Sequence, residues 1–469
     1  MTPLLSGFNP DPSIVRVDDA YYLVTSTFEY LPGLPVYRSA DLLSWELVGH
    51  VITRPEQAGL DDVPTPGGVW APTIRHRDGI YYVTVTIMMG GRGCVVYTAT
   101  DPAGPWSDGV QVPAVTGIDP DLAWDENGTA YVTFADFPRE LQQVRVDLAT
   151  GEALGPARPV WKGSGLYAPE GPHLYRRGEW WYLLAAEGGT DRGHVVTIAR
   201  SASPDGPFES SPHNPVISAR STGSPVQNVG HADLVSTDDG DAMVLLGVRP
   251  VGLAQAFSPL GRETFLASVS WTEGWPIATL RDVPGSDPGV DWISVRRTPS
   301  AVGVPVGGRV TITGDGRGMD DPRPWFVGRR QAHLGATFSA VVDASAGTGG
   351  VAARHDETHF LTVSASGGTV TATAALAGFS RTWTADVGPG ELRLGLDLER
   401  ASRDFRDGDV GAGTIRFWAA VDGERRVLAE VDGRYWSFEV AKSFTGRVLG
   451  VFAEAGTVDF SEIEYVGRD

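Results

Sequence analysis

The first 290 residues repeat one pattern of apolar and polar positions five times. In each copy a short apolar run leads into a polar turn, and a second run of aromatic and aliphatic residues follows. Turns such as Asp78-Gly79 and Asn127-Gly128 favour tight hairpins, because these residue types tolerate a positive φ. The copies recur about every 50 to 60 residues, which is the size of a four-stranded propeller blade. The first runs, which we expect to form the inner strands, are residues 12–15, 72–75, 120–123, 171–174 and 231–234.

We therefore predict an all-β fold, with a five-bladed β-propeller over residues 1–297 followed by a C-terminal β-sandwich over residues 325–469. Gly, Pro and Asp concentrate between residues 298 and 324, which predicts a linker. Beyond it, short alternating runs resume at a spacing typical of a sandwich. These runs are residues 360–363, 370–373, 392–396, 415–418 and 448–452.

Composition and charge narrow the classes of function. Gly (59) and Pro (33) are frequent while hydrophobic residues make up 42% of the 469, which is typical of a turn-rich β protein rather than a disordered chain. A formal net charge of −20 disfavours nucleic acid and membrane partners but is compatible with a neutral sugar. One cysteine, no recognisable secretory leader and no apolar run of bilayer length lead us to expect a cytoplasmic protein.

Three acidic residues stand at the starts of predicted inner strands. Asp11, Asp119 and Glu170 belong to the first, third and fourth blades, and each adjoins a proline. Inner strands of a propeller converge on its axis, so these carboxylates are expected to share one pocket and to perturb one another's pKa. Glycoside hydrolysis requires such a set, because it needs a proton donor and a base on either side of the bond. For each acid taken alone, capping of a turn is the structural alternative.

Four further residues are candidates for substrate contact. Phe28 and Trp70 lie beside inner strands, where an aromatic plane either stacks on a sugar ring or packs between blades. His231 opens the fifth inner strand and either contacts substrate or bonds to a neighbouring blade. Arg262 is a candidate to bind an acid or a sugar hydroxyl. The alternative is an ordinary surface arginine.

At these positions the sequence resembles a known family. The motifs are Phe8-Asn9-Pro10-Asp11-Pro12-Ser13, Ser26-Thr27-Phe28-Glu29-Tyr30-Leu31-Pro32-Gly33, Gly68-Val69-Trp70-Ala71-Pro72 and Glu170-Gly171-Pro172-His173. In this order they are similar to glycoside hydrolase family 43, in particular to its β-xylosidase and α-L-arabinofuranosidase members. The likeness continues into Trp325-Phe326-Val327-Gly328-Arg329-Arg330-Gln331, which is similar to the start of that group's C-terminal sandwich.

The resemblance implies an inverting mechanism with three carboxylates. Asp11 matches the general base that activates water, and Glu170 matches the general acid that protonates the leaving oxygen. Asp119 matches the third acid, which orients the donor and modulates its pKa. Asp121 stands only two residues further on, so the choice between Asp119 and Asp121 rests on the Ile118-Asp119-Pro120 motif.

Arg262 and His231 also acquire roles from the resemblance. Arg262 matches an arginine near the base in the terminal subsite, and His231 matches a histidine of the axial channel. In some members that histidine lies near a bound metal ion, so the resemblance allows a structural calcium ion in the channel, although no cofactor is required. A contribution to the pocket from C-terminal loops, for example around Phe444, stays open.

The predicted function is exo-acting release of terminal xylose or arabinose from xylo-oligosaccharides or arabinose-substituted glycans, as in xylan degradation. The partner is a small oligosaccharide, and a homo-oligomer is compatible with the sequence. Preference between xyloside and arabinofuranoside stays open. A non-catalytic carbohydrate-binding propeller is the alternative, but it would not need all three acids. A fructoside-acting propeller enzyme with a covalent nucleophile is a third hypothesis, which the motif around Asp11 does not match.

Overall fold

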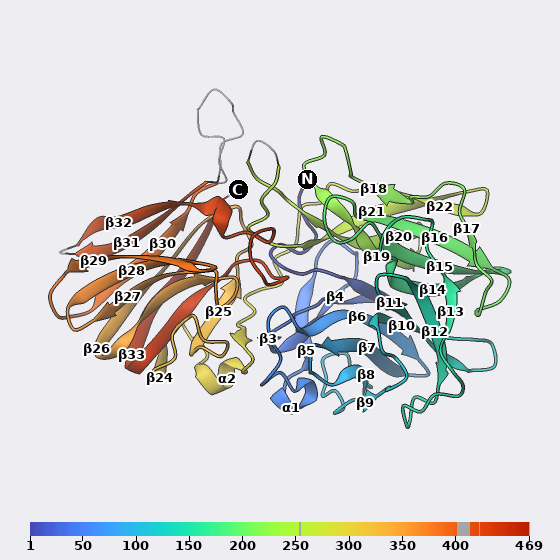
Figure 1. Ribbon diagram of the computed structural model, residues 1–469, viewed down its shortest axis with the longest axis horizontal. Coiled ribbons are helices and arrows are strands. Elements are labelled where there is room, and N and C mark those ends of the chain that lie inside the picture. The colour runs from blue at the N-terminus through green and yellow to red at the C-terminus, as the bar shows by residue number, and fades with distance from the viewer. Residues whose placement is uncertain (253–254, 401–412, 422, 469) are drawn as a thin grey trace. The chain divides into compact units, whose positions relative to one another are not determined.

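The computed structural model describes residues 1–252, 255–400, 413–421 and 423–468. The chain divides into two compact units (Figure 1). The first comprises residues 1–28, 33–248 and 263–289, and the second comprises residues 29–32, 249–262 and 290–469. Within the described residues, no helix is both long and apolar enough to cross a membrane.

Five antiparallel sheets make up the first unit and confirm the predicted five-bladed propeller. Each sheet begins with the strand predicted to be innermost and continues outwards in chain order. The first strands are β1 (Ser13–Val17), β6 (Gly68–Arg77), β10 (Ile118–Trp124), β14 (Glu170–Arg177) and β19 (Gln227–Thr237). The second strands are β2 (Ala20–Val24), β7 (Ile80–Met88), β11 (Ala130–Asp136), β15 (Trp180–Glu187) and β20 (Gly240–Val248).

The outer strands complete each blade, and the fourth blade has one strand more than the others. The third strands are β4 (Gly33–Ser39), β8 (Gly93–Ala99), β12 (Glu140–Val146), β16 (Val195–Ser201) and β21 (Glu263–Thr272). The outermost strands are β5 (Glu46–Ile52), β9 (Val110–Gln111), β13 (Arg158–Trp161), β17 (Glu209–Ser210) with β18 (Ile217–Ser218), and β22 (Trp275–Leu280). The short helix α1 (Pro55–Ala58) follows the first blade.

A buried ionic network lies where the inner strands converge. Arg75 on β6 reaches Asp121 on β10 at 2.7 Å and Asp233 on β19 at 2.9 Å, and both carboxylates are fully buried. Burial alone would raise the pKa of Asp233, but the Arg75 guanidinium lowers it below its ordinary value. The two carboxylates in turn raise the pKa of Arg75 against the effect of burial.

The remaining inner strands join the same network. Ser13 on β1 donates to Asp233 Oδ2 at 2.6 Å. On β14, the Tyr175 hydroxyl donates to Asp233, and His173 Nδ1 lies 3.2 Å from Asp121 Oδ1. All five blades are therefore linked by polar side chains at the axis.

The second unit is built around two long antiparallel strands, β26 (Gly335–Arg354) and β33 (Val448–Arg468). Register shifts along this pair let the sheet bend into the two layers of the predicted sandwich. Its core contains Phe338, Leu396 and Phe417. The other strands of this sheet are β24 (Val310–Asp315), β25 (Phe326–Arg330), β27 (Phe360–Ser366), β28 (Thr369–Leu376), β29 (Phe379–Asp386), β30 (Leu392–Leu398), β31 (Thr414–Val421) and β32 (Glu424–Asp432).

Residues 298–324, predicted as a linker, contain helix α2 (Pro299–Val302) and strand β24. β24 pairs with β33 from Val310 opposite Phe460 onward, and Ile312 buries its side chain in the core. The second unit also includes a two-stranded sheet of β3 (Tyr30–Leu31) and β23 (Ser294–Val295). The sequence pattern did not predict the edge strand β24. This strand has only six residues, which offer few alternating positions, and its flanks are rich in Gly and Asp.

Candidate active site

The predicted acids occupy irregular starts of the inner strands. Asp11 (φ 54°) and Asp119 (φ 55°) adopt the left-handed conformation, which is costly for residues other than glycine. The β10–β11 register shifts between Ile118 and Asp121, and the β14–β15 register shifts just after Glu170. Bulges of this kind re-aim side chains at strand ends. The backbone thus departs from regular pairing at the positions where the sequence predicts catalytic carboxylates.

Asp119 lies beside the backbone of Glu170. Its Oδ2 accepts a hydrogen bond of 3.0 Å from the amide of Gly171, the residue that follows Glu170. Asp119 is buried, whereas Glu170 is half-buried and pairs with Ala186. The third and fourth blades therefore bring these two predicted acids to one place.

Asp11 and His231 also meet at this end of the propeller. Ser26 Oγ donates to Asp11 Oδ2 at 2.6 Å, and His231 Nδ1 lies 3.7 Å from Asp11 Oδ1. A methyl group added at Gly171 would lie 3.0 Å from the His231 ring. Glycine at position 171 therefore lets the imidazole approach the segment that carries Glu170.

Glu187 is a buried carboxylate that the sequence analysis did not single out. It is the last residue of β15 and accepts hydrogen bonds from Ser164 N (2.5 Å), Ser164 Oγ (2.7 Å) and Leu166 N (3.3 Å). A Cβ at Gly163 would collide with this carboxylate. Glu187 thus anchors the loop that leads into Glu170. The sequence pattern indicates only that Glu187 ends an apolar strand.

The two predicted aromatic contacts have different surroundings. Phe28 is buried, has φ 53°, and exchanges two backbone hydrogen bonds with Val69 at the start of β6. Trp70 is half-buried, and its indole N–H donates to Pro66 O at 3.0 Å. Trp70 also packs against the cluster that contains Ile118, so packing accounts for part of its surface. Sugar stacking by either residue stays a prediction.

Arg262 belongs to the second unit. Its guanidinium lies 5.6 Å from the ring centre of Phe438 and 5.5 Å from that of Phe444, and the side chain is buried. The arginine is thus positioned by two aromatic rings of its own unit, and its place in a terminal subsite stays a prediction.

The metal-ligating side chains of the described residues are not clustered. No group of three or more His, Cys, Asp or Glu side chains in this part of the chain is arranged to hold an ion. At the axis, where Asp121 and Asp233 approach each other, the cation between them is the guanidinium of Arg75. Arg75 therefore neutralises these two carboxylates, and a calcium ion near His231 stays a prediction.

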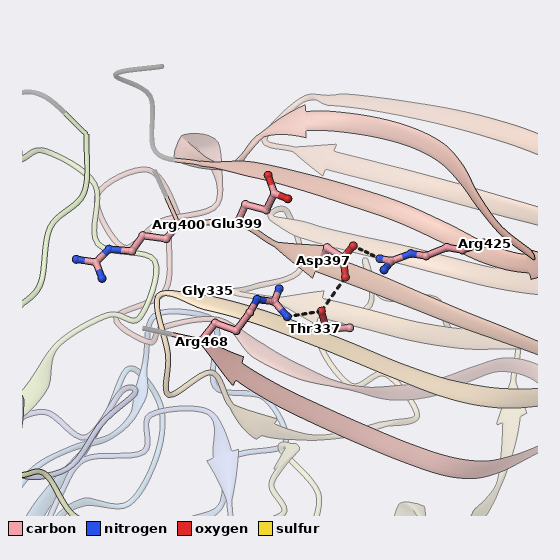
Figure 2. A pocket seen from close by; sticks show the side chains of 7 residues that line it. All are labelled: Gly335, Thr337, Asp397, Glu399, Arg400, Arg425 and Arg468. Atoms are coloured by element: carbon pink, nitrogen blue, oxygen red, sulfur yellow. Dashed lines mark hydrogen bonds and ion pairs between the residues drawn. The ribbon is translucent and has the colours of Figure 1, made fainter. Parts of the chain in front are cut away.

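A hollow of about 440 Å³ on the second unit lies apart from the predicted chemistry (Figure 2). Arg425 forms an ion pair with Asp397, and Arg468 donates to Thr337 Oγ1 at 2.9 Å. Arg400 points away from the other side chains (Figure 2). None of the predicted site residues lines this hollow.

Comparisons with known proteins show the family to which the chain belongs. Residues 1–276 match the model of the family described as Glycosyl hydrolases family 43. The chain is 41% identical over 375 residues to a non-reducing end α-L-arabinofuranosidase of Bacteroides ovatus, a match that covers 73% of this chain and 70% of the relative. It is 41% identical over 292 residues to a xylosidase/arabinosidase of Butyrivibrio fibrisolvens, covering 59% of this chain and 55% of the relative. The solved structure of the Bacteroides ovatus xyloglucan PUL GH43B protein has a TM-score of 0.88 at 34% identity and covers 98% of both chains.

Proposed function

Because this chain belongs to glycosyl hydrolases family 43, we propose that it removes terminal xylose or arabinose from oligosaccharides by an inverting mechanism. The protein is a glycoside hydrolase. The names of its relatives, which include a non-reducing end arabinofuranosidase and a xylosidase/arabinosidase, support exo-action on a terminal pentose. The same findings give no support to a non-catalytic carbohydrate-binding propeller. The buried free thiol of Cys94 supports a further proposal, a cytoplasmic location.

In the proposed reaction Asp11 takes a proton from the attacking water while Glu170 protonates the leaving oxygen. These two groups must flank the bond with room for water between them. Asp11 comes from the first blade and Glu170 from the fourth, and His231 lies near both Asp11 and Gly171. Such an arrangement supports carboxylates that approach the bond from separate sides.

The observation that carries the proposal is the hydrogen bond from Gly171 N to Asp119 Oδ2. It holds a third carboxylate beside the segment that bears Glu170. A negative charge near an acid disfavours its ionisation, so Asp119 is proposed to keep Glu170 protonated until it donates. Asp119 is therefore proposed as the orienting acid, and Asp121 as part of the axial network.

Hydrolysis of two nitrophenyl pentosides tests the proposal. The wild type should release nitrophenol from the β-D-xyloside, the α-L-arabinofuranoside or both. Glu170→Gln should lose about a hundredfold or more on xylobiose or an arabinose-substituted oligosaccharide, because that leaving group needs a proton. The loss on nitrophenyl substrates should be smaller, since nitrophenolate leaves readily. Equal losses on both kinds of substrate would contradict the acid role of Glu170.

A further inference from the structure

Two aromatic side chains of the propeller are exposed and touch each other. Phe137 is 45% exposed and Tyr167 is 65% exposed, and their ring centres lie 6.4 Å apart at an interplanar angle of 76°. Single exposed apolar residues are common on protein surfaces, but an exposed aromatic pair offers a continuous apolar area to a ligand.

Strand register places this pair at the end of the blades that carries the proposed acids. Phe137 follows β11 directly, two residues after Ala135, which pairs with Ile118 next to Asp119. Tyr167 stands three residues before Glu170. The two rings therefore come from the third and fourth blades, as do Asp119 and Glu170.

The backbone of Tyr167 is fixed although its ring is uncovered. Gly188 N donates to Tyr167 O at 2.6 Å, and the preceding residue, Leu166, donates to Glu187. A ring on an anchored backbone loses little conformational freedom when a ligand stacks on it. These anchors distinguish Tyr167 from a side chain on a loose surface loop.

We propose that Phe137 and Tyr167 form a stacking platform for the sugar on the leaving-group side of the cleaved bond. This inference rests on the proposed function, because the general acid protonates the leaving oxygen and the leaving sugar must therefore pass Glu170. Sugar rings present apolar C–H faces that pack on aromatic planes. The occupant is thus the neutral ring next to the terminal pentose, and the preferred substrate is an oligosaccharide rather than a simple glycoside.

The test compares a substrate that reaches the platform with one that does not. The first is xylotriose, or an arabinose-substituted xylotriose if the enzyme prefers arabinofuranosides, and the second is the corresponding methyl pentoside. Tyr167→Ala and Phe137→Ala should each lower kcat/KM for the oligosaccharide about threefold to tenfold more than for the methyl pentoside. Tyr167→Phe retains the ring and should retain the wild-type ratio.

Trp180→Ala is the matched control, because Trp180 is 36% exposed and begins β15 at the opposite end of the fourth blade. It should leave the ratio of the two kcat/KM values unchanged. An unchanged ratio in active Tyr167→Ala and Phe137→Ala variants would overturn this inference alone. Failure of the wild type to hydrolyse any of these pentosides would overturn the proposed function as well, so the two failures are distinguishable.

Discussion

Asp119 and Asp121 lie on the same strand, β10, but make different contacts. Asp119 accepts a hydrogen bond from Gly171 N, whereas Asp121 accepts one from Leu174 N at 2.8 Å and pairs with Arg75. The bulge between Ile118 and Asp121 separates the two environments. Residue spacing alone could not decide between them, and only the Ile-Asp-Pro motif favoured Asp119.

Separate substitution of the two aspartates distinguishes the proposed catalytic role of Asp119 from the structural role of Asp121. Asp119→Asn should lower kcat about tenfold to a hundredfold and move the alkaline limb of the pH–rate profile to lower pH, because removal of a nearby negative charge lowers the pKa of Glu170. Asp121→Asn should instead lower the free energy of unfolding by about 2 kcal/mol, since it weakens buried hydrogen bonds to charged partners. The opposite pattern, read from pH–rate profiles and urea titrations, would exchange the two assignments.

At the scale of elements, the five inner strands are joined by the ionic network around Arg75. Replacing Arg75 by Met leaves Asp121 and Asp233 buried without their cation, and should lower the free energy of unfolding by about 3–5 kcal/mol at neutral pH. Arg38→Met is the control, because Arg38 pairs with Glu46 on the surface, where such a pair contributes about 0–1 kcal/mol. Losses of similar size in both variants, measured in urea, would refute the structural role of the network.

The difference in free energy of unfolding between wild type and Arg75→Met depends on pH in a defined direction. Asp233 has a lowered pKa in the folded protein, so its pairing stabilises the fold above the ordinary Asp pKa of about 4. That contribution is lost as the pH falls through the folded pKa. In Arg75→Met burial raises the pKa of Asp233 instead, so the stability gap between wild type and variant should begin to narrow above about pH 4 and continue to narrow as the pH falls further.

How well the sequence predicted an element depended on whether its signal was repeated. The inner strands and their hairpins recur in every blade, so each copy supports the others, and the five predicted positions match β1, β6, β10, β14 and β19. Strand β24 has no such repeat. Local sequence patterns could not predict the roles of Glu187, Phe137 and Tyr167. These roles depend on contacts between segments that are distant in the chain.

At the scale of the whole molecule, the propeller brings residues from separate blades to one end of its axis. Asp11, Asp119, Glu170 and His231 come from the first, third, fourth and fifth blades. Their meeting could be predicted because a propeller directs the starts of all inner strands to the same end. The second unit was predicted as a fold, but the contact of Arg262 with the rings of Phe438 and Phe444 was not predicted.

Proton NMR of the first sugar released tests the central claim most directly, because one spectrum reports its identity, its length and its anomeric configuration. Digestion of xylo-oligosaccharides and of arabinoxylan should yield free pentose from the first minutes. We expect α-xylose from a β-xyloside, or β-L-arabinose from an α-L-arabinofuranoside, before mutarotation, because an inverting enzyme delivers water to the opposite face. Retained configuration, or early accumulation of oligosaccharides from the polymer, would contradict an inverting, exo-acting pentosidase.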